Sequence, residues 1–188
     1  MHQPAITTAD KTAADYTART PGIVTHTTAF ISGPQTAKIS VHAAGTDEAQ
    51  MVVAFGHVMM TFRTAAAVAG VITAFAHVRA VLTGVDARTA LPAQPGDDFA
   101  LPALSIVWLA KPEATTIART AYSAEQRRTL YWVDLRMGPI TWRITDRIGY
   151  DTLMSELRTV HRAAVGVFRD GGTFRRDPTV VPDAFEQA

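Results

Sequence analysis

The chain has 188 residues, a formal net charge of +1 and no cysteine. This length suits one domain with a sizeable core, and 47% hydrophobic with 19% charged residues excludes both a disordered chain and a strongly basic polyanion binder. The absence of cysteine excludes disulfides, thiolate metal sites and cysteine nucleophiles. We therefore expect one globular domain in a reducing, cytoplasmic environment.

The basic residues are unevenly distributed along the chain. Residues 1–94 hold six Lys or Arg and five Asp or Glu, whereas residues 111–176 hold twelve basic and seven acidic residues. Any positively charged binding surface is therefore expected in the second half of the chain. Only three of the 18 basic residues are lysines, a bias that is typical of GC-rich genomes such as those of actinobacteria.

Neither the N-terminus nor the apolar stretches predict a membrane protein. Residues 1–20 lack the basic and apolar regions of a secretory signal and are predicted to form a flexible tail. The most apolar window, residues 64–78, is uncharged but shorter than the roughly 20 residues of a membrane span. We expect no membrane association.

From residue 23 onward the first half is rich in Thr, Val and Ile. Residues 23–32 and 37–44 are predicted to form a β-hairpin, because a Gly-Pro turn signal separates them. Residues 51–62 are also expected to be extended, either as one strand bent at Gly56 or as two short strands.

A helix is predicted to follow, from Thr64 as N-cap to about Leu82, with Gly84 as its stop. One face of this helix is apolar and the opposite face is mostly Ala and Gly, whose small side chains allow close approach of another element. We expect the helix to be covered on both sides. Residues 85–100, rich in Pro, Gly and Asp, are predicted to be a linker.

The second half has the same order of elements. Four strands are predicted, at residues 103–110, 115–122, 129–137 and 140–145. A helix is predicted over residues 150–168, because apolar residues recur there at close to helical spacing, and a Gly-Gly pair ends it. Residues 173–188 are expected to be an irregular tail.

The two halves match each other in sequence pattern. An offset of 78 aligns Phe30 with Trp108, and an offset of 82 aligns Gly56 with Gly138 and Phe62 with Ile144. We therefore predict one α+β domain over residues 21–172. It consists of two tandem antiparallel strand-rich units, each followed by one long helix, in a pseudo-twofold ββββα repeat over residues 21–84 and 101–172.

Two tandem units of four strands and a helix resemble the Whirly-type fold that binds single-stranded DNA, and a related group of actinobacterial sporulation and cell-division proteins. The resemblance is one of topology and covers about residues 23–169. It implies a fold and a class of ligand. The Lys-Gly-Lys-Ala-Ala-Leu motif of plant Whirly proteins has no counterpart in this chain, so the resemblance assigns no binding residue.

Strand alternation in the second half predicts a candidate nucleic-acid-binding face. Within residues 129–137, Trp132 and Arg136 point away from the apolar side, and Arg143 of the next strand is expected beside them. Rings interleaved with arginines suit single-stranded DNA or RNA, because bases stack on rings while guanidinium groups meet phosphates. The predicted set is Arg119, Arg128, Trp132, Arg136 and Arg143. The alternatives are an ordinary solvated sheet face, or a Trp132 that is buried under a tail.

In the first half, residues 51–62 are apolar on both faces, so this segment cannot face water. Either helices cover both faces, or the segment supplies an oligomer interface, where Met and aromatic residues are enriched. The residues predicted for such an interface are Met51, Val53, Phe55 and Met59.

No catalytic, metal or cofactor site is predicted. The histidines have no helical i, i+4 pair and no carboxylate at ligand spacing, and no serine lies in a Gly-x-Ser-x-Gly context. Asp97-Asp98 could bind a cation, but beside Pro95-Gly96 the pair is more simply predicted to form a turn. An enzyme with a pocket between the halves has no residue-level support.

The sequence thus favours a non-enzymatic binding protein for single-stranded nucleic acid. The alternative is a structural or scaffolding protein that acts by self-assembly or by docking a protein partner.

Overall fold

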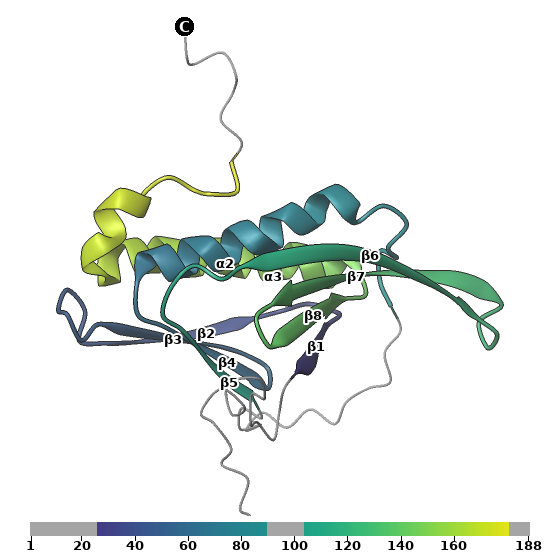
Figure 1. The fold of residues 1–188 in the computed structure, drawn as a ribbon, viewed down its shortest axis with the longest axis horizontal. Coiled ribbons are helices and arrows are strands. Elements are labelled where there is room, and N and C mark those ends of the chain that lie inside the picture. The colour runs from purple at the N-terminus through teal and green to yellow at the C-terminus, as the bar shows by residue number, and fades with distance from the viewer. Residues whose placement is uncertain (1–25, 90–103, 181–188) are drawn as a thin grey trace, which may run out of the picture.

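A computed structural model describes residues 26–89 and 104–180 of the chain, and these residues form an α+β fold, as predicted. Two long helices pack against two four-stranded sheets (Figure 1). The strands are β1 (Thr27–Ile31), β2 (Ala37–His42), β3 (Gln50–Phe55), β4 (Val58–Phe62), β5 (Leu104–Trp108), β6 (Ala114–Ser123), β7 (Arg128–Met137) and β8 (Ile140–Ile144). The helices are α2 (Ala65–Val78) and α3 (Arg147–Val167), with 3₁₀ turns η1 (Arg79–Val81) and η2 (Arg169–Phe174).

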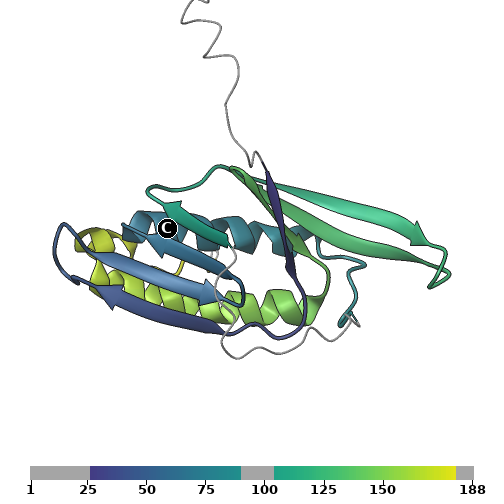
Figure 2. The same cartoon turned by 90° about the horizontal axis from the view of Figure 1, so that it is seen from below.

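Each sheet combines three consecutive antiparallel strands with one parallel strand from the other half of the chain. Sheet I has the order β2-β3-β4-β5, and sheet II has the order β1-β8-β7-β6. Strand β5 joins sheet I in parallel with β4, and β1 joins sheet II in parallel with β8. Figure 2 shows β1 crossing the molecule to reach sheet II. The halves are therefore interlocked by exchange of their first strands.

The predicted hairpin of residues 23–32 with residues 37–44 is wrong. Strand β2 pairs with β3, while β1 lies on β8 with Thr27 opposite Ile140 and Ile31 opposite Ile144. Gly33, with φ +66°, does turn the chain, but the turn leads from one sheet to the other. Two segments rich in β-branched residues with a turn between them predict two strands, but this local pattern does not predict which strands they pair with.

The exchange also corrects the alignment of the halves at these strands. Phe30 is 62% exposed whereas Trp108 is buried, so they do not occupy matching positions. Ile31 and Trp108 do match, because they lie opposite Ile144 and Phe62 respectively. The first-strand offset is therefore 77 (108 − 31), one less than the sequence pattern indicated.

The extended stretch of residues 51–62 is two strands. Strands β3 and β4 pair in antiparallel, with Phe55 opposite Val58. The two residues between them form a tight turn in which Gly56 has φ +50°, a conformation that favours glycine.

Helix α2 begins as predicted, because the Thr64 side chain accepts a hydrogen bond from the Ala67 backbone N–H. It is also covered on both sides. A Cβ atom at Gly70 would lie 2.9 Å from the Lys111 Cα, so the absence of a side chain lets the loop after β5 pass directly over the helix.

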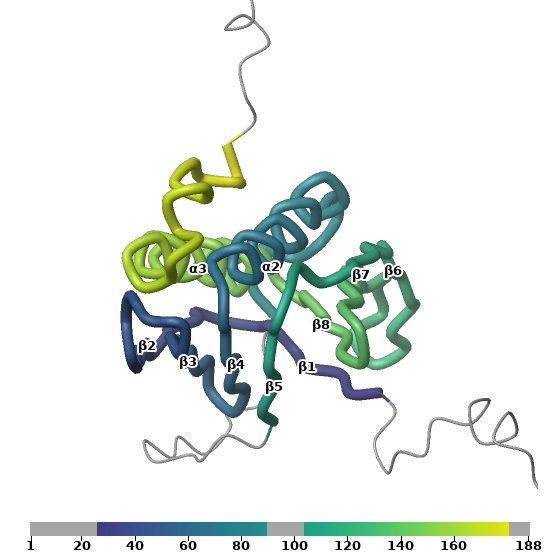
Figure 3. The backbone as a smooth tube through the Cα atoms, turned by 60° about the vertical axis from the view of Figure 1, so that its left-hand side comes forward, coloured from purple at the N-terminus to yellow at the C-terminus, as the bar shows by residue number. Residues whose placement is uncertain are grey.

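Helices α2 and α3 pack on each other and lie along one side of both sheets (Figures 1 and 3). The ring of Phe75 on α2 meets Trp142 of β8 edge-on at 5.5 Å, and the Tyr150 hydroxyl of α3 donates to the Phe75 carbonyl at 3.2 Å. The inner faces of both sheets and the facing sides of both helices thus form one core.

Helix α3 begins at Arg147, three residues before the predicted start, because Asp146 caps it. The fully buried Asp146 carboxylate accepts hydrogen bonds from the Gly149 N–H at 2.8 Å, the Ser32 hydroxyl at 2.8 Å, the Gly33 N–H at 3.0 Å and the Thr89 N–H at 3.1 Å. One side chain therefore joins three segments of the chain.

The described part of the predicted linker, residues 85–89, is held at the same place, since the Arg147 N–H donates to the Asp86 carbonyl at 2.9 Å. The rest of the linker from residue 90, Asp97-Asp98, the predicted N-terminal tail and residues 181–188 of the predicted C-terminal tail lie outside the described residues. Within the described ranges, no helix is long and apolar enough to span a membrane.

Replacing Asp146 with Asn should destabilise the fold. Asn keeps the size of the side chain but offers one acceptor oxygen in place of two, so buried N–H and O–H donors lose their partners, at a cost of about 2–4 kcal/mol. Urea denaturation measures the loss. The exposed Asp151 on the same helix is the control: Asp151→Asn should leave the urea midpoint unchanged, and equal midpoints for the two variants would contradict the role of Asp146.

The difference in stability between wild type and Asp146→Asn should become smaller at acid pH. Burial by itself would raise the pKa of the Asp146 carboxyl, but the hydrogen bonds from Gly33, Thr89, Gly149 and Ser32 outweigh it and hold the pKa below its usual value. Its contribution to stability is then fully present above the unfolded-state pKa of about 3.9 and is lost as pH falls through the folded-state value. The stability gap between wild type and Asp146→Asn should therefore narrow below about pH 4, and a pH-independent gap would contradict this.

Candidate nucleic-acid interface

The outer face of sheet II, which points away from the helices, carries the predicted aromatic and basic residues. On β7, the side chains of Val133, Leu135 and Met137 are fully buried toward the core. Strand alternation therefore directs Trp132, Asp134 and Arg136 to the opposite, outer face. The predicted assignment of the two sides of β7 agrees with this burial.

Arg143 lies at the centre of this face between two rings. Its guanidinium carbon is 5.3 Å from the Trp132 ring centroid and 5.6 Å from the Phe30 ring centroid. Phe30 is directly opposite Arg143 across the β1–β8 pair. Both distances fall within the range of cation–π interactions, so the three side chains form a stack that spans three strands.

Asp134 is the counter-ion of this cluster and is itself buried. Its carboxylate accepts two hydrogen bonds from Arg143, at 2.8 and 3.1 Å, and lies 3.5 Å from Arg119. The hydrogen bond to Asp134 raises the pKa of Arg143 above its usual value. Asp134 therefore fixes the position of Arg143 and offsets part of the positive charge of the face.

The outer face is hollowed around these residues. The hollow has a volume of about 480 Å³ and contains Arg119, Trp132, Arg136 and Arg143, so four of the five predicted residues come together. At one rim a His26 ring nitrogen lies 2.7 Å from the Thr141 hydroxyl, within hydrogen-bond distance. Three arginines and one aspartate leave this surface with a net charge of about +2.

Arg128, the fifth predicted residue, lies elsewhere. It is at the start of β7 and forms a bidentate pair with Asp86, with N–O distances of 2.6 and 2.9 Å. This pair lowers the pKa of the Asp86 carboxyl. Arg128 therefore connects the β6–β7 hairpin to the segment after η1 and does not line the hollow.

The residues predicted for an oligomer interface are mostly internal. Met51 and Val53 have no exposed surface and Phe55 has little, so these side chains fill the core of the chain itself. Met59 points to the outer side of sheet I and is half-buried. Core packing therefore accounts for the apolar character of Met51, Val53 and Phe55.

Phe30 and Asp134 are the important residues that sequence reasoning missed. The predicted hairpin with residues 37–44 places Phe30 in sheet I, whereas the structure has β1 in sheet II beside β8. The alternation of β7 places Asp134 on the same face as Trp132 and Arg136, and this is the sequence signal that could have identified it. Its role as a counter-ion depends on the β7–β8 register, which places it opposite Arg143.

The described residues contain no group of three or more His, Asp or Glu that could hold a metal ion. No family model matches the chain, and neither a curated protein nor a solved structure matches it.

Trp132→Ala should cause a moderate loss of stability. Trp132 is half-buried, and its indole N–H is buried without a hydrogen-bond partner among the described residues. We expect a cost of about 1–3 kcal/mol, compared with about 3–5 kcal/mol for Trp142→Ala in the core. Urea denaturation of both variants checks this. A loss for Trp132→Ala as large as that for Trp142→Ala would place Trp132 in the core and contradict a surface role.

Proposed function

We propose that the protein is a non-enzymatic binding protein for single-stranded DNA or RNA and that the outer face of sheet II is its binding surface. The observation that carries the proposal is the stack of Phe30, Arg143 and Trp132 beside further arginines. Flat rings next to guanidinium groups are the two elements from which single-strand binding surfaces are built.

Phe30 is the ring that is available to a base. It is 62% exposed, it lies on an edge strand, and its position is supported by Arg143 from one side. An unpaired base can stack on an exposed ring regardless of its identity, because every base has a π-face. Recognition at Phe30 is therefore expected to tolerate different sequences.

Arg136 is the group that is available to a phosphate. It is exposed and has no ion pair among the described residues, whereas Arg119 and Arg143 share Asp134. Because Asp134 offsets part of the charge, we expect modest affinity that falls as salt rises. Such a surface suits a protein that binds and releases single strands.

The fold is consistent with the same proposal. Four strands and a helix occur twice along the chain, which supports a Whirly-like ββββα repeat. The exchange of β1 and β5 brings Phe30 of the first half to the arginines of the second. The composition, with only three lysines among 18 basic residues and no cysteine, supports an actinobacterial source and a cytoplasmic location as part of this proposal.

A fluorescence titration with mixed-sequence oligonucleotides tests the proposal. Binding should weaken as salt increases, and Phe30→Ala should reduce affinity by about 1–3 kcal/mol, the value of one stacked base, without changing the melting temperature. Tyr122→Ala is the matched control, because Tyr122 is a similarly exposed ring near the end of β6, opposite Thr129, whereas Phe30 stacks on Arg143. No binding at low salt, or equal losses for Phe30→Ala and Tyr122→Ala, would contradict the proposal.

A scaffolding role through self-assembly is the second candidate, favoured by two exposed apolar residues at the edge of sheet I. Val107 on β5 is 55% exposed and Leu109, just beyond it, is 69% exposed. Exposed apolar side chains beside an unpaired strand edge are typical of protein contacts.

If the protein assembles through this edge, light scattering should report a mass that rises with protein concentration. Val107→Lys should lower the mass to that of a monomer, because it places a charge in the contact. A wild-type protein that is a monomer at every concentration would contradict this role.

A further inference from the structure

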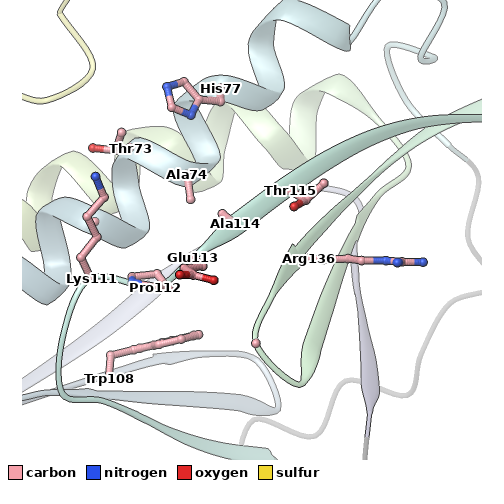
Figure 4. A pocket seen from close by; sticks show the side chains of 12 residues that line it. Thr73, Ala74, His77, Trp108, Lys111, Pro112, Glu113, Ala114, Thr115 and Arg136 are labelled. Carbon is pink, nitrogen blue, oxygen red and sulfur yellow. The ribbon is translucent and has the colours of Figure 1, made fainter.

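A second concave site lies around the edge of sheet II, on the side that faces α2. This pocket has a volume of about 770 Å³ and opens between α2 and the start of β6 (Figure 4). Its walls come from α2, from the loop between β5 and β6, and from the first residues of β6; they include Thr73, His77, Trp108, Lys111, Glu113 and Ala114. This size lies within the range of pockets that bind small organic groups.

The pocket exists because of two features of the fold. The loop after β5 crosses α2 at Gly70, where a Cβ atom would collide with Lys111. Strand β6 is an edge strand that pairs only with β7, so one side of its backbone at Ala114 and Thr115 has no strand partner among the described residues. The pocket therefore offers unpaired backbone donors and acceptors of β6 beside a small apolar wall.

Arg136 connects the pocket to the binding surface, since it lines both the pocket and the hollow on the outer face of sheet II. Figure 4 shows Arg136 extending away from the pocket, while Lys111 extends along α2 beside Thr73. Lys111 and Arg136 outnumber the single acid Glu113, so the pocket and its rim favour a ligand with negative charge.

We propose that this pocket takes up one nucleobase of the strand bound on the outer face of sheet II, while Arg136 at the rim contacts the phosphate next to it. This inference rests on the proposed function. A strand that crosses the hollow would continue over Arg136 and around the β6 edge, where a base can turn inward. Unpaired backbone groups of β6 offer hydrogen bonds to the edge of a flat base, and the apolar wall covers its face.

Filling the pocket tests the proposal. Ala114 is exposed and lines the pocket but not the hollow, so Ala114→Phe should occupy the space of the base without disturbing the core. We expect affinity for a mixed-sequence oligonucleotide to fall by about tenfold, as for the loss of one stacked base. The slope of log Kd against log salt should stay unchanged, because no phosphate contact is removed.

Ala118→Phe is the matched control. Ala118 lies on the same strand and the same side as Ala114 and is exposed, but it lines neither the pocket nor the hollow. This variant should bind like wild type. Thr73→Phe, which fills the pocket from the opposite wall on α2, should reproduce the loss if Ala114→Phe lowers the melting temperature.

The outcomes separate this inference from the proposed function. If wild type binds and both pocket-filling variants bind equally well, the pocket takes no base and only this inference fails. If wild type does not bind at low salt, both fail. A mixture of nucleoside 5′-monophosphates provides a further arm: if these bind wild type and not Ala114→Phe, while strand affinity is the same in both, the pocket is a site for free nucleotides and the inference is overturned.

Discussion

The buried carboxylate of Asp146 is the interaction on which the interlocked fold depends. A charged group without contact with water must be satisfied by hydrogen bonds, and Asp146 obtains them from Ser32 and Gly33 just after β1, from Thr89, and from the first turn of α3. These bonds fix the end of β1 beside the end of β8. Since Phe30 lies two residues before Ser32, the carboxylate at the helix start also positions the exposed ring of the proposed binding surface.

The start of α2 is fastened in a related way, by a carboxylate from another part of the chain. Besides the Thr64 cap, the Ala65 and Ala66 N–H groups donate to Asp170 of η2 at 2.9 and 3.0 Å. Negative groups stabilise the positive end of a helix. Each helix start is thus joined by hydrogen bonds to a segment more than 100 residues away in sequence, and these bonds connect the two halves of the chain.

Sequence patterns predicted the elements of this fold well but not their partners. The cap at Thr64, the small face of α2 and the two sides of β7 follow from local chemistry and from periodicity, which each segment carries in its own residues. The parallel pairing of β1 with β8 depends on long-range geometry that no local pattern encodes. The same limit applies to the site: alternation could direct Trp132, Arg136 and Arg143 to one face, whereas the contribution of Phe30 required knowing in which sheet β1 lies.

The strand exchange gives the two sheets matching outer faces with different chemistry. Where sheet II has Phe30, Arg143 and Asp134 side by side, the corresponding row of sheet I has Val107, Thr61 and Val52. The first row carries a ring, a cation and its counter-ion, while the second is uncharged and mostly apolar. Cations attract phosphates, so the row of sheet II is the one of the two that suits the proposed nucleic-acid binding. Within the sheet I row, Val107 is exposed at the edge, whereas Val52 is half-buried and Thr61 is buried, and an exposed apolar edge residue of this kind suits contact with another protein surface. The two candidate functions therefore belong to different faces and are compatible in one molecule.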